Sequence, residues 1–73
     1  MQVFFLSFFF CDQLYNLQTH KLFHLEDLIE FFNLKKNLIV IEYNGKVTNP
    51  QNWLSIEIKN HDKIEIISIV GGG

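Results

Sequence analysis

Few side chains in this chain are candidates for catalysis or metal binding. The first candidates are two histidines. His20 and His24 are four residues apart, a spacing that places two imidazoles on one helical face and can serve a metal ion. No cysteine or carboxylate completes a ligand set nearby, because Glu26 and Asp27 project in other directions. Histidines at the surface or at the start of a helix are the simpler interpretation. We therefore predict no metal site.

Three further features invite a functional interpretation: the pair His61-Asp62, Cys11 and Trp53. His61 and Asp62 could act as a base and its orienting carboxylate, but they lie in a predicted turn with no nucleophile nearby, so a turn is favoured. Cys11, the only cysteine, follows a run of phenylalanines with no basic neighbour to activate its thiol, and we predict that it is buried and inert. A single cysteine also excludes a disulfide framework and a cysteine-based zinc site. Trp53 is either an interface anchor or a core residue beneath the loop at Pro50, and the core is favoured. The sequence thus predicts no catalytic residue.

The last three residues, Gly71, Gly72 and Gly73, form a run that we call the glycine tail. Glycine costs more conformational entropy to order than any other residue, so a strand gains no stability by continuing into three of them. A frayed end is the plainest interpretation. The alternative is a slim segment without β-carbons that threads a narrow channel into the active site of another protein.

A glycine tail in such a channel presents one reactive group, the terminal carboxylate. A carboxylate is a poor electrophile until it is activated, so this interpretation implies a partner enzyme that adenylates it with ATP. An amine, a thiol or a persulfide can then displace AMP from the acyl carbon. The partner uses the ATP, and we expect the chain itself to bind no cofactor.

Hydrophobic periodicity predicts one helix among several strands. Apolar residues recur every three to four positions between Leu22 and Phe32, with acidic residues on the other side, which predicts an amphipathic helix at about 24–33. Strands are predicted from β-branched, aromatic or alternating runs at residues 3–11, 14–18, 38–43, 54–59 and 63–70, with a two-residue turn at Asp12-Gln13 and another turn at Asn44-Gly45.

This order predicts an α+β fold in which a mixed four- to five-stranded sheet is covered on one face by the helix at about 24–33. We expect one domain over residues 1–70 and a flexible tail over residues 71–73. Hydrophobic residues make up 48% of the chain, which excludes intrinsic disorder. The net charge is −2 and arginine is absent, so we expect no nucleic-acid partner, because phosphate binding needs clustered basic residues.

The composition also bears on where the chain is made. Phenylalanine, isoleucine, asparagine and lysine are abundant while alanine is absent, a bias that indicates an AT-rich coding sequence in an organellar genome or an AT-rich bacterium. The apolar run from Val3 to Phe10 lacks the basic residues and cleavage site of a signal peptide. It is also far shorter than the roughly 20 residues that span a bilayer. We expect the chain to work where it is synthesised, without a membrane partner.

The first strand is apolar on both sides. Because the helix covers only one face of the sheet, either the even-numbered residues from Phe4 to Phe10 or the odd-numbered set that contains Phe5 and Phe9 must face outward. An outward aromatic cluster marks a docking surface or an aggregation hazard. We predict that Phe5 and Phe9 dock a partner enzyme. The alternative is that compositional bias filled a tolerant face with phenylalanine.

The pattern resembles the ThiS-type sulfur carriers of thiamine biosynthesis, which have a ubiquitin-like β-grasp fold. The resemblance covers nearly the whole chain: the first strand, the helix LFHLEDLIEFFNL, the segment IVIEYNGKV with its Asn-Gly turn, Pro50 and Trp53, and the closing segment DKIEIISIVGGG, which is the most specific part. His61 departs from it, standing where the family usually has a glycine before the aspartate.

The resemblance implies a carrier protein and not an enzyme. An E1-like adenylyltransferase would adenylate Gly73, and a persulfide donor would supply the sulfur that turns the adenylate into a thiocarboxylate. Gly71 and Gly72 would lead Gly73 into partner active sites, and thiazole synthase would receive the sulfur. The expected compartment is the plastid (chloroplast) stroma with an organelle-encoded gene, or alternatively the bacterial cytoplasm.

Three other interpretations stay open at this point. The small subunit of molybdopterin synthase also carries sulfur on a terminal Gly-Gly, but it is usually longer and approaches the glycines through proline and serine, whereas Ile69-Val70 precede them here. A ubiquitin-like protein modifier would conjugate the same carboxylate to lysines. A binding module with an idle tail is the third.

Overall fold

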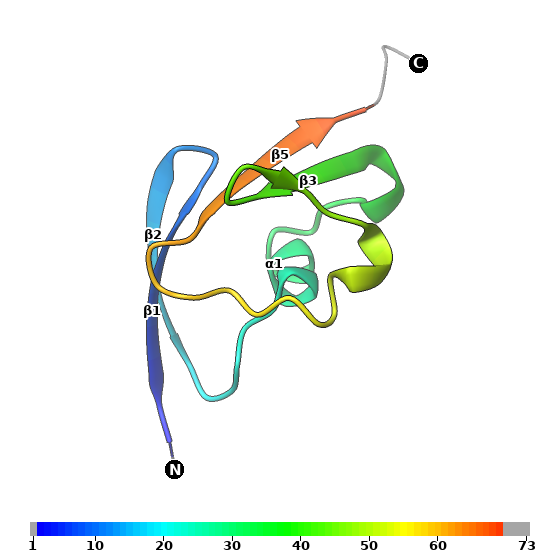
Figure 1. Ribbon diagram of the computed structural model, residues 1–73. Coiled ribbons are helices and arrows are strands. Elements are labelled where there is room, and N and C mark those ends of the chain that lie inside the picture. Colours follow the sequence, from blue (N-terminus) through cyan, green and yellow to red (C-terminus); the bar gives the residue numbers. More distant parts are fainter. Residues whose placement is uncertain (1, 70–73) are drawn as a thin grey trace.

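The structure is a computed structural model that describes residues 2–69, and over that range one α-helix packs on one face of a five-stranded sheet (Figure 1). The predicted α+β architecture is therefore confirmed. The elements in chain order are β1 (Phe4–Phe10), β2 (Gln13–Thr19), α1 (Leu25–Phe31), the 3₁₀ turn η1 (Lys36–Leu38), β3 (Ile39–Tyr43), β4 (Lys46–Val47), the 3₁₀ turn η2 (Pro50–Asn52) and β5 (Lys63–Ser68).

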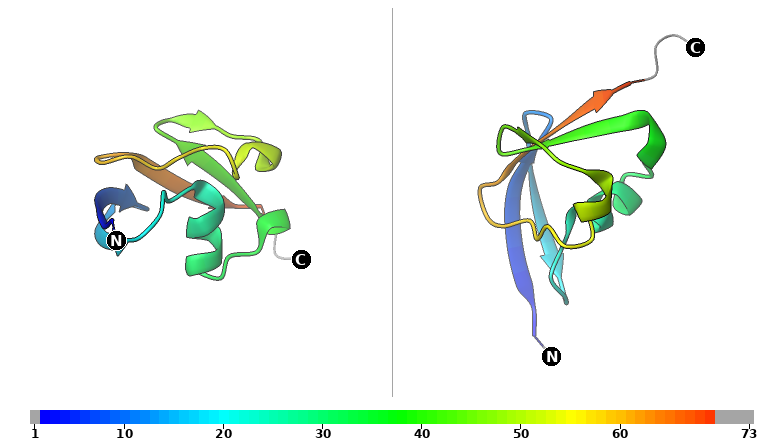
Figure 2. Two further views of the ribbon diagram at one scale, coloured as in Figure 1. Left: turned by 90° about the horizontal axis from the view of Figure 1, so that it is seen from below. Right: turned by 45° about the vertical axis from the view of Figure 1, so that its right-hand side comes forward.

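The sheet is mixed, with the strand order β2-β1-β5-β3-β4. β5 lies at its centre, parallel to β1 on one side and antiparallel to β3 on the other. The other pairs, β1 with β2 and β3 with β4, are antiparallel. Seen from below, α1 lies on one side of the sheet and leaves the opposite side uncovered (Figure 2). We call that uncovered side the free face.

The first hairpin turns one residue earlier than predicted. Cys11 and Asp12 form the turn, with φ of 51° and 65°, and Gln13 already belongs to β2. Positive φ at both central residues is the signature of the type I′ turn that suits the twist of a two-residue hairpin. The prediction of a buried Cys11 is wrong for the same reason: the residue sits in the turn and not in the strand, and its side chain is exposed.

The helix is shorter than the predicted range of about 24–33. His24 is its N-cap, and the backbone N–H of His24 donates to Asp27 Oδ2 at 2.8 Å, which closes a capping box. At the other end Asn33 adopts a left-handed φ of 55°, which stops the helical backbone. Lys36 in η1 forms an ion pair with Glu26, which ties the segment after the helix back to its first turn.

The prediction of a sheet strand at 54–59 is wrong. Glu57 forms only an isolated antiparallel bridge with His24, and the N–H of Ile58 donates to the Phe23 carbonyl at 2.8 Å. The fifth strand of the sheet is β4 instead, which follows the predicted Asn44-Gly45 turn. The alternation of apolar and polar residues along 54–59 indicates only that one side of the segment is buried. In the structure this segment pairs with the backbone that leads into α1.

The core lies between α1 and the sheet. Trp53 is fully buried, and its Nε1–H donates to Thr48 Oγ1 at 2.8 Å, so the predicted core role of this tryptophan is confirmed. The buried apolar residues are Leu6, Phe8, Phe10, Leu25, Leu28, Ile29, Ile39, Ile41, Trp53, Ile58 and Ile64. Over residues 2–69 no helix has the length and hydrophobicity to cross a membrane.

Candidate functional site

The glycine tail lies outside the described residues, but the strand that leads to it is well defined. β5 occupies the centre of the sheet, and Ser68 stands opposite Ile39 of β3. One residue further on, the N–H of Ile69 donates to the Leu38 carbonyl at 2.9 Å. Backbone hydrogen bonds therefore fix the chain to the domain as far as Ile69.

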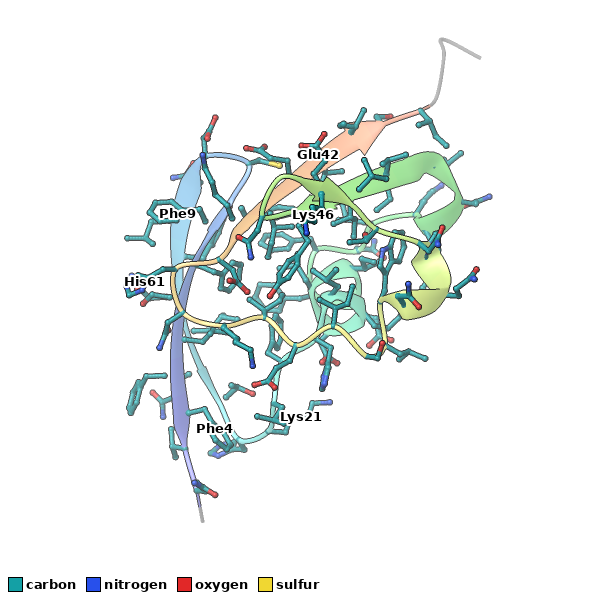
Figure 3. All side chains as sticks on the ribbon, in the orientation of Figure 1. Phe4, Phe9, Lys21, Glu42, Lys46 and His61 are labelled. Carbon is teal, nitrogen blue, oxygen red and sulfur yellow. The ribbon has the colours of Figure 1, made fainter. Side chains whose placement is uncertain are left out.

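Two phenylalanines of β1 stand on the free face, Phe9 next to the first hairpin turn and Phe5 near the other end of the strand. Phe5 is 74% exposed and Phe9 is 36% exposed, whereas Phe8 and Phe10 on the other side of β1 are buried. Figure 3 shows Phe9 on the side of β1 away from α1. Leu14 of β2, in register with Phe9, is 51% exposed beside it. The structure thus selects the odd-numbered set as the outward one, and the docking role of Phe5 and Phe9 stays a prediction.

A second apolar group lies on the free face nearer the end of β5. Ile67 is half-exposed and stands in register with Val40 of β3, and Ile69 follows it along the chain. Apolar side chains are thus spread along the free face from the first hairpin to the end of β5.

Two carboxylates lie between these apolar groups. Glu42 of β3 and Glu65 of β5 are in register on the free face, because their neighbours Ile41 and Ile64 are buried on the helix side. Like charges opposite each other on adjacent strands are destabilising. None of the ion pairs found within residues 2–69 involves either carboxylate. A partner that places a basic side chain there would relieve the repulsion.

The histidine pair is divided by the start of the helix. The helix begins after His24, so His20 lies outside it and the two side chains do not share a helical face. Nowhere in residues 2–69 do three histidine, cysteine or acidic side chains gather closely enough to hold a metal ion. His24 instead serves the helix start, with its Nδ1 3.5 Å from Asp27 Oδ2.

The Asp27 carboxyl carries a shifted pKa because of this cap. Its partial burial is the largest single effect and raises the pKa, but the hydrogen bond from the His24 N–H and the nearby charges of Lys21 and His24 together outweigh it. The pKa of Asp27 is therefore held below its usual value of 3.8. A charged Asp27 at neutral pH strengthens the cap of α1.

His61 and Asp62 form a turn, as predicted. His61 adopts φ of 71°, so it keeps the left-handed backbone that glycine would favour at this position. Asp62 Oδ2 accepts hydrogen bonds from the Lys59 N–H at 2.7 Å and from the Tyr43 hydroxyl. Burial, with help from the bond to Asp62, raises the pKa of Tyr43, so this hydroxyl remains a donor. Asp62 thus has a structural role in this turn.

The sequence interpretation missed the carboxylate pair on the free face. A signal for it was present, because Glu42 and Glu65 each alternate with buried isoleucines in a predicted strand. Their pairing was not visible, since the register of β3 against β5 depends on contacts between residues far apart in the sequence.

Comparisons with known proteins point to one family. The sequence model of the ThiS family matches residues 15–73, which is most of the chain and includes the glycine tail. The chain is 45% identical to the uncharacterized protein ycf40 of Trieres chinensis over 67 residues, covering 92% of this chain and 89% of that protein. It is 29% identical to the sulfur carrier protein ThiS of Bacillus subtilis over 49 residues, covering 67% and 74%.

A solved structure agrees with the fold. The crystal structure of the thiamine biosynthesis protein ThiS from Geobacter metallireducens superposes with a TM-score of 0.80, covering 93% of this chain and all of that one. The sequence identity is 16%, so this likeness establishes the fold alone. The predicted β-grasp fold is thereby confirmed.

Proposed function

Because this chain belongs to the ThiS family of small sulfur carrier proteins, we propose that it carries sulfur as a thiocarboxylate on Gly73 and delivers it to thiazole synthase for thiamine biosynthesis. The observation that carries the proposal is the family match, which extends through residue 73 and so includes the glycine tail. The chain is the cosubstrate of its partner enzymes, and the chemistry takes place in their active sites.

The reaction begins with activation of the Gly73 carboxylate. One carboxylate oxygen attacks the α-phosphorus of ATP in an E1-like adenylyltransferase, which forms the acyl-adenylate and releases pyrophosphate. The terminal sulfur of a cysteine-derived persulfide then attacks the acyl carbon, and AMP leaves. A thiol cleaves the resulting S–S bond and becomes part of a disulfide, while the thiocarboxylate stays on Gly73. ATP is a cosubstrate of the partner enzyme.

The free face is the proposed docking surface for the adenylyltransferase. Phe5 and Phe9 offer aromatic area along β1, and Glu42 with Glu65 offer negative charge on β3 and β5. Aromatic side chains on partly exposed surfaces are frequent anchors of protein interfaces. The matching enzyme surface is apolar with a basic side chain opposite the two carboxylates.

We propose the plastid stroma as the site of action, with an organelle-encoded gene. Two observations support this: the compositional bias of an AT-rich coding sequence, and similarity to ycf40 of Trieres chinensis, whose gene name is of the kind used in plastid genomes. Finding the gene in a nuclear or bacterial genome would contradict this localisation without affecting the carrier chemistry.

Intact-mass spectrometry tests the carrier function. The full chain is incubated with the adenylyltransferase, magnesium ATP, a persulfide donor and a thiol, and the expected product has one carboxylate oxygen replaced by sulfur. A variant that lacks Gly73 should keep the fold and give no such product. Covalent attachment to lysines of other proteins would instead indicate a modifier. An unchanged mass in the presence of an active enzyme would contradict the proposal.

A further inference from the structure

The outer edge of β2 is open along its whole length. β2 is the first strand in the order β2-β1-β5-β3-β4, so within the sheet only β1 lies beside it. Its seven residues pair with β1 in an uninterrupted antiparallel register from Phe4↔Thr19 to Phe10↔Gln13. The edge is therefore long and straight, without a bulge.

Backbone hydrogen bonds on the far side of β1 show which groups of β2 point outward. The N–H groups of Phe9 and Cys11 donate toward β5, to Asp62 at 2.8 Å and Ile64 at 2.9 Å. Odd-numbered residues of β1 therefore face β5, and even-numbered residues face β2. In the register of the hairpin, the even-numbered residues of β1 pair with odd-numbered residues of β2.

The remaining residues of β2 direct their backbone groups away from the sheet. These are Leu14, Asn16 and Gln18, and among the described residues no backbone group bonds to their N–H or carbonyl groups. Three outward N–H groups and three outward carbonyls in alternation are the template that another β-strand completes.

The usual protections of an edge strand are missing from β2. Natural sheets discourage edge pairing with lysine, proline, bulges or very short strands. Between Gln2 and Thr19 the only charged side chain is Asp12, in the turn, and there is no proline. The opposite edge differs, because β4 is only two residues long and carries Lys46. The two edges of this sheet are thus built in contrasting ways.

We propose that β2 pairs in antiparallel fashion with β2 of a second copy of this chain, about a two-fold axis at Asn16. In this register Asn16 faces Asn16 of the second copy, and Leu14 faces Gln18 at both ends. All three positions carry outward backbone groups, so the pairing forms about six backbone hydrogen bonds, two for each hydrogen-bonded pair. No other antiparallel register aligns as many of the outward groups.

Side chains on the helix side of β2 favour the same register. Tyr15 and Leu17 are both half-buried there and pack against the core. With the axis at Asn16, Tyr15 faces Leu17 of the second copy on both sides of the axis, at non-hydrogen-bonded sites where side chains come closest. A shift of two residues in either direction would place one of these apolar residues opposite Gln13 or Thr19. The strand is therefore self-complementary in one register.

The proposed assembly closes at two copies. A two-fold pairing uses both β2 edges, and the edges that remain are the short β4 strands with Lys46. The pairing leaves β5 and the free face uncovered, since only the edge of β2 takes part. It is independent of the proposed carrier function, which depends on Gly73.

Sedimentation and amide exchange test the proposal on the full chain. With increasing protein concentration the mass should rise from 8.6 kDa toward twice that value. Amide exchange measured by NMR at low and high concentration should slow selectively at Leu14, Asn16 and Gln18. The amides of Tyr15 and Leu17 already bond to β1 and should show no such concentration dependence.

Edge variants provide the control. Asn16→Pro removes one outward N–H and no backbone hydrogen bond to β1, although it also removes the side-chain oxygen that accepts from the Ser7 hydroxyl. Gln18→Lys leaves that side-chain bond in place and puts a charge at the dimer interface. Each should weaken the dimer at least tenfold, whereas Val47→Lys adds the same charge on β4 and should not. A chain that stays at 8.6 kDa at every concentration would overturn the proposal. So would a dimer in which the amides of Leu14, Asn16 and Gln18 exchange as fast as in the monomer, or protection of them that appears only when a partner enzyme is added.

Discussion

The hydroxyl of Tyr43 donates a hydrogen bond to the carboxylate of Asp62, which ties the end of β3 to the turn that leads into β5. The same hydroxyl lies 3.0 Å from the carbonyl oxygen of Glu57. Asp62 Oδ1 also accepts from Asn44 Nδ2 at 3.1 Å, and Asn44 Oδ1 accepts from the Lys63 N–H at 2.8 Å. These bonds hold the start of the central strand, whose other end leads toward the glycine tail.

Tyr43→Phe should lower the free energy of unfolding by about 1–2 kcal/mol, because it removes one hydrogen bond to a carboxylate that is partly buried. Urea denaturation at neutral pH measures this, since the raised pKa of Tyr43 keeps the hydroxyl protonated there. Tyr15→Phe is the matched control, because Tyr15 packs through its ring against Phe8 and Phe32. Equal effects of the two substitutions would show that the bond to Asp62 contributes nothing.

His61→Gly should stabilise the fold by about 0.5–1 kcal/mol. His61 has φ of 71°, a left-handed conformation that costs an L-residue more than it costs glycine, and the relief exceeds the entropy that glycine gains in the unfolded chain. Thermal unfolding of His61→Gly and His61→Ala decides the matter. Alanine removes the same imidazole and keeps the β-carbon, so it should not stabilise. If both variants are stabilised alike, the imidazole and not the backbone is the source of the strain.

The elements of this fold that depend on local periodicity could be predicted from the sequence. Apolar residues at helical spacing from Leu22 to Phe32 placed α1, and the Asn44-Gly45 turn separated β3 from the next strand. The segment at 54–59 could not be placed, because alternation shows which side is buried and not which backbone is the hydrogen-bonding partner. That partner, the backbone around His24, is about thirty residues away in the chain.

The candidate site could also be predicted only in part. The sequence showed that one set of phenylalanines in the first strand must be exposed, but not which set. The sequence left two choices for the outward face of β1, because the hairpin alone does not say which side α1 covers. The structure resolves this by burying Phe8 and Phe10 under α1 and exposing Phe5 and Phe9. The bond between Tyr43 and Asp62 had no sequence signal, since nineteen positions separate the two residues.

Asp27 should make the stability of the fold depend on pH in the acid range. Its pKa in the folded chain lies below the value of 3.8 expected in the unfolded chain, so its contribution is present above pH 3.8 and is lost as the pH falls through the folded pKa. Asp27→Asn keeps an acceptor for the His24 N–H but removes the charge, which should cost about 0.5–1 kcal/mol at pH 7.

Urea denaturation of the chain and of Asp27→Asn from pH 7 downward measures this difference, which should shrink below pH 3.8. Glu30→Gln is the control for the loss of a negative charge as such, because it removes one carboxylate from the other end of α1. It should not destabilise at pH 7, because a negative charge in the last turn opposes the helix dipole. A difference between Asp27→Asn and the unsubstituted chain that persists unchanged in acid would assign the effect of Asp27 to packing.

Replacing Phe5 and Phe9 together with threonine should weaken binding to the adenylyltransferase at least tenfold if they anchor the proposed interface. Threonine is β-branched and suits a strand, so the double variant should stay folded, with a lower melting temperature because Phe9 is only 36% exposed. Isothermal titration calorimetry measures the affinity. Leu54→Thr is the control, because Leu54 is 72% exposed but lies beside the start of α1, away from the free face. Unchanged affinity in the double variant would mean that the phenylalanines reflect composition and that the enzyme holds the chain elsewhere.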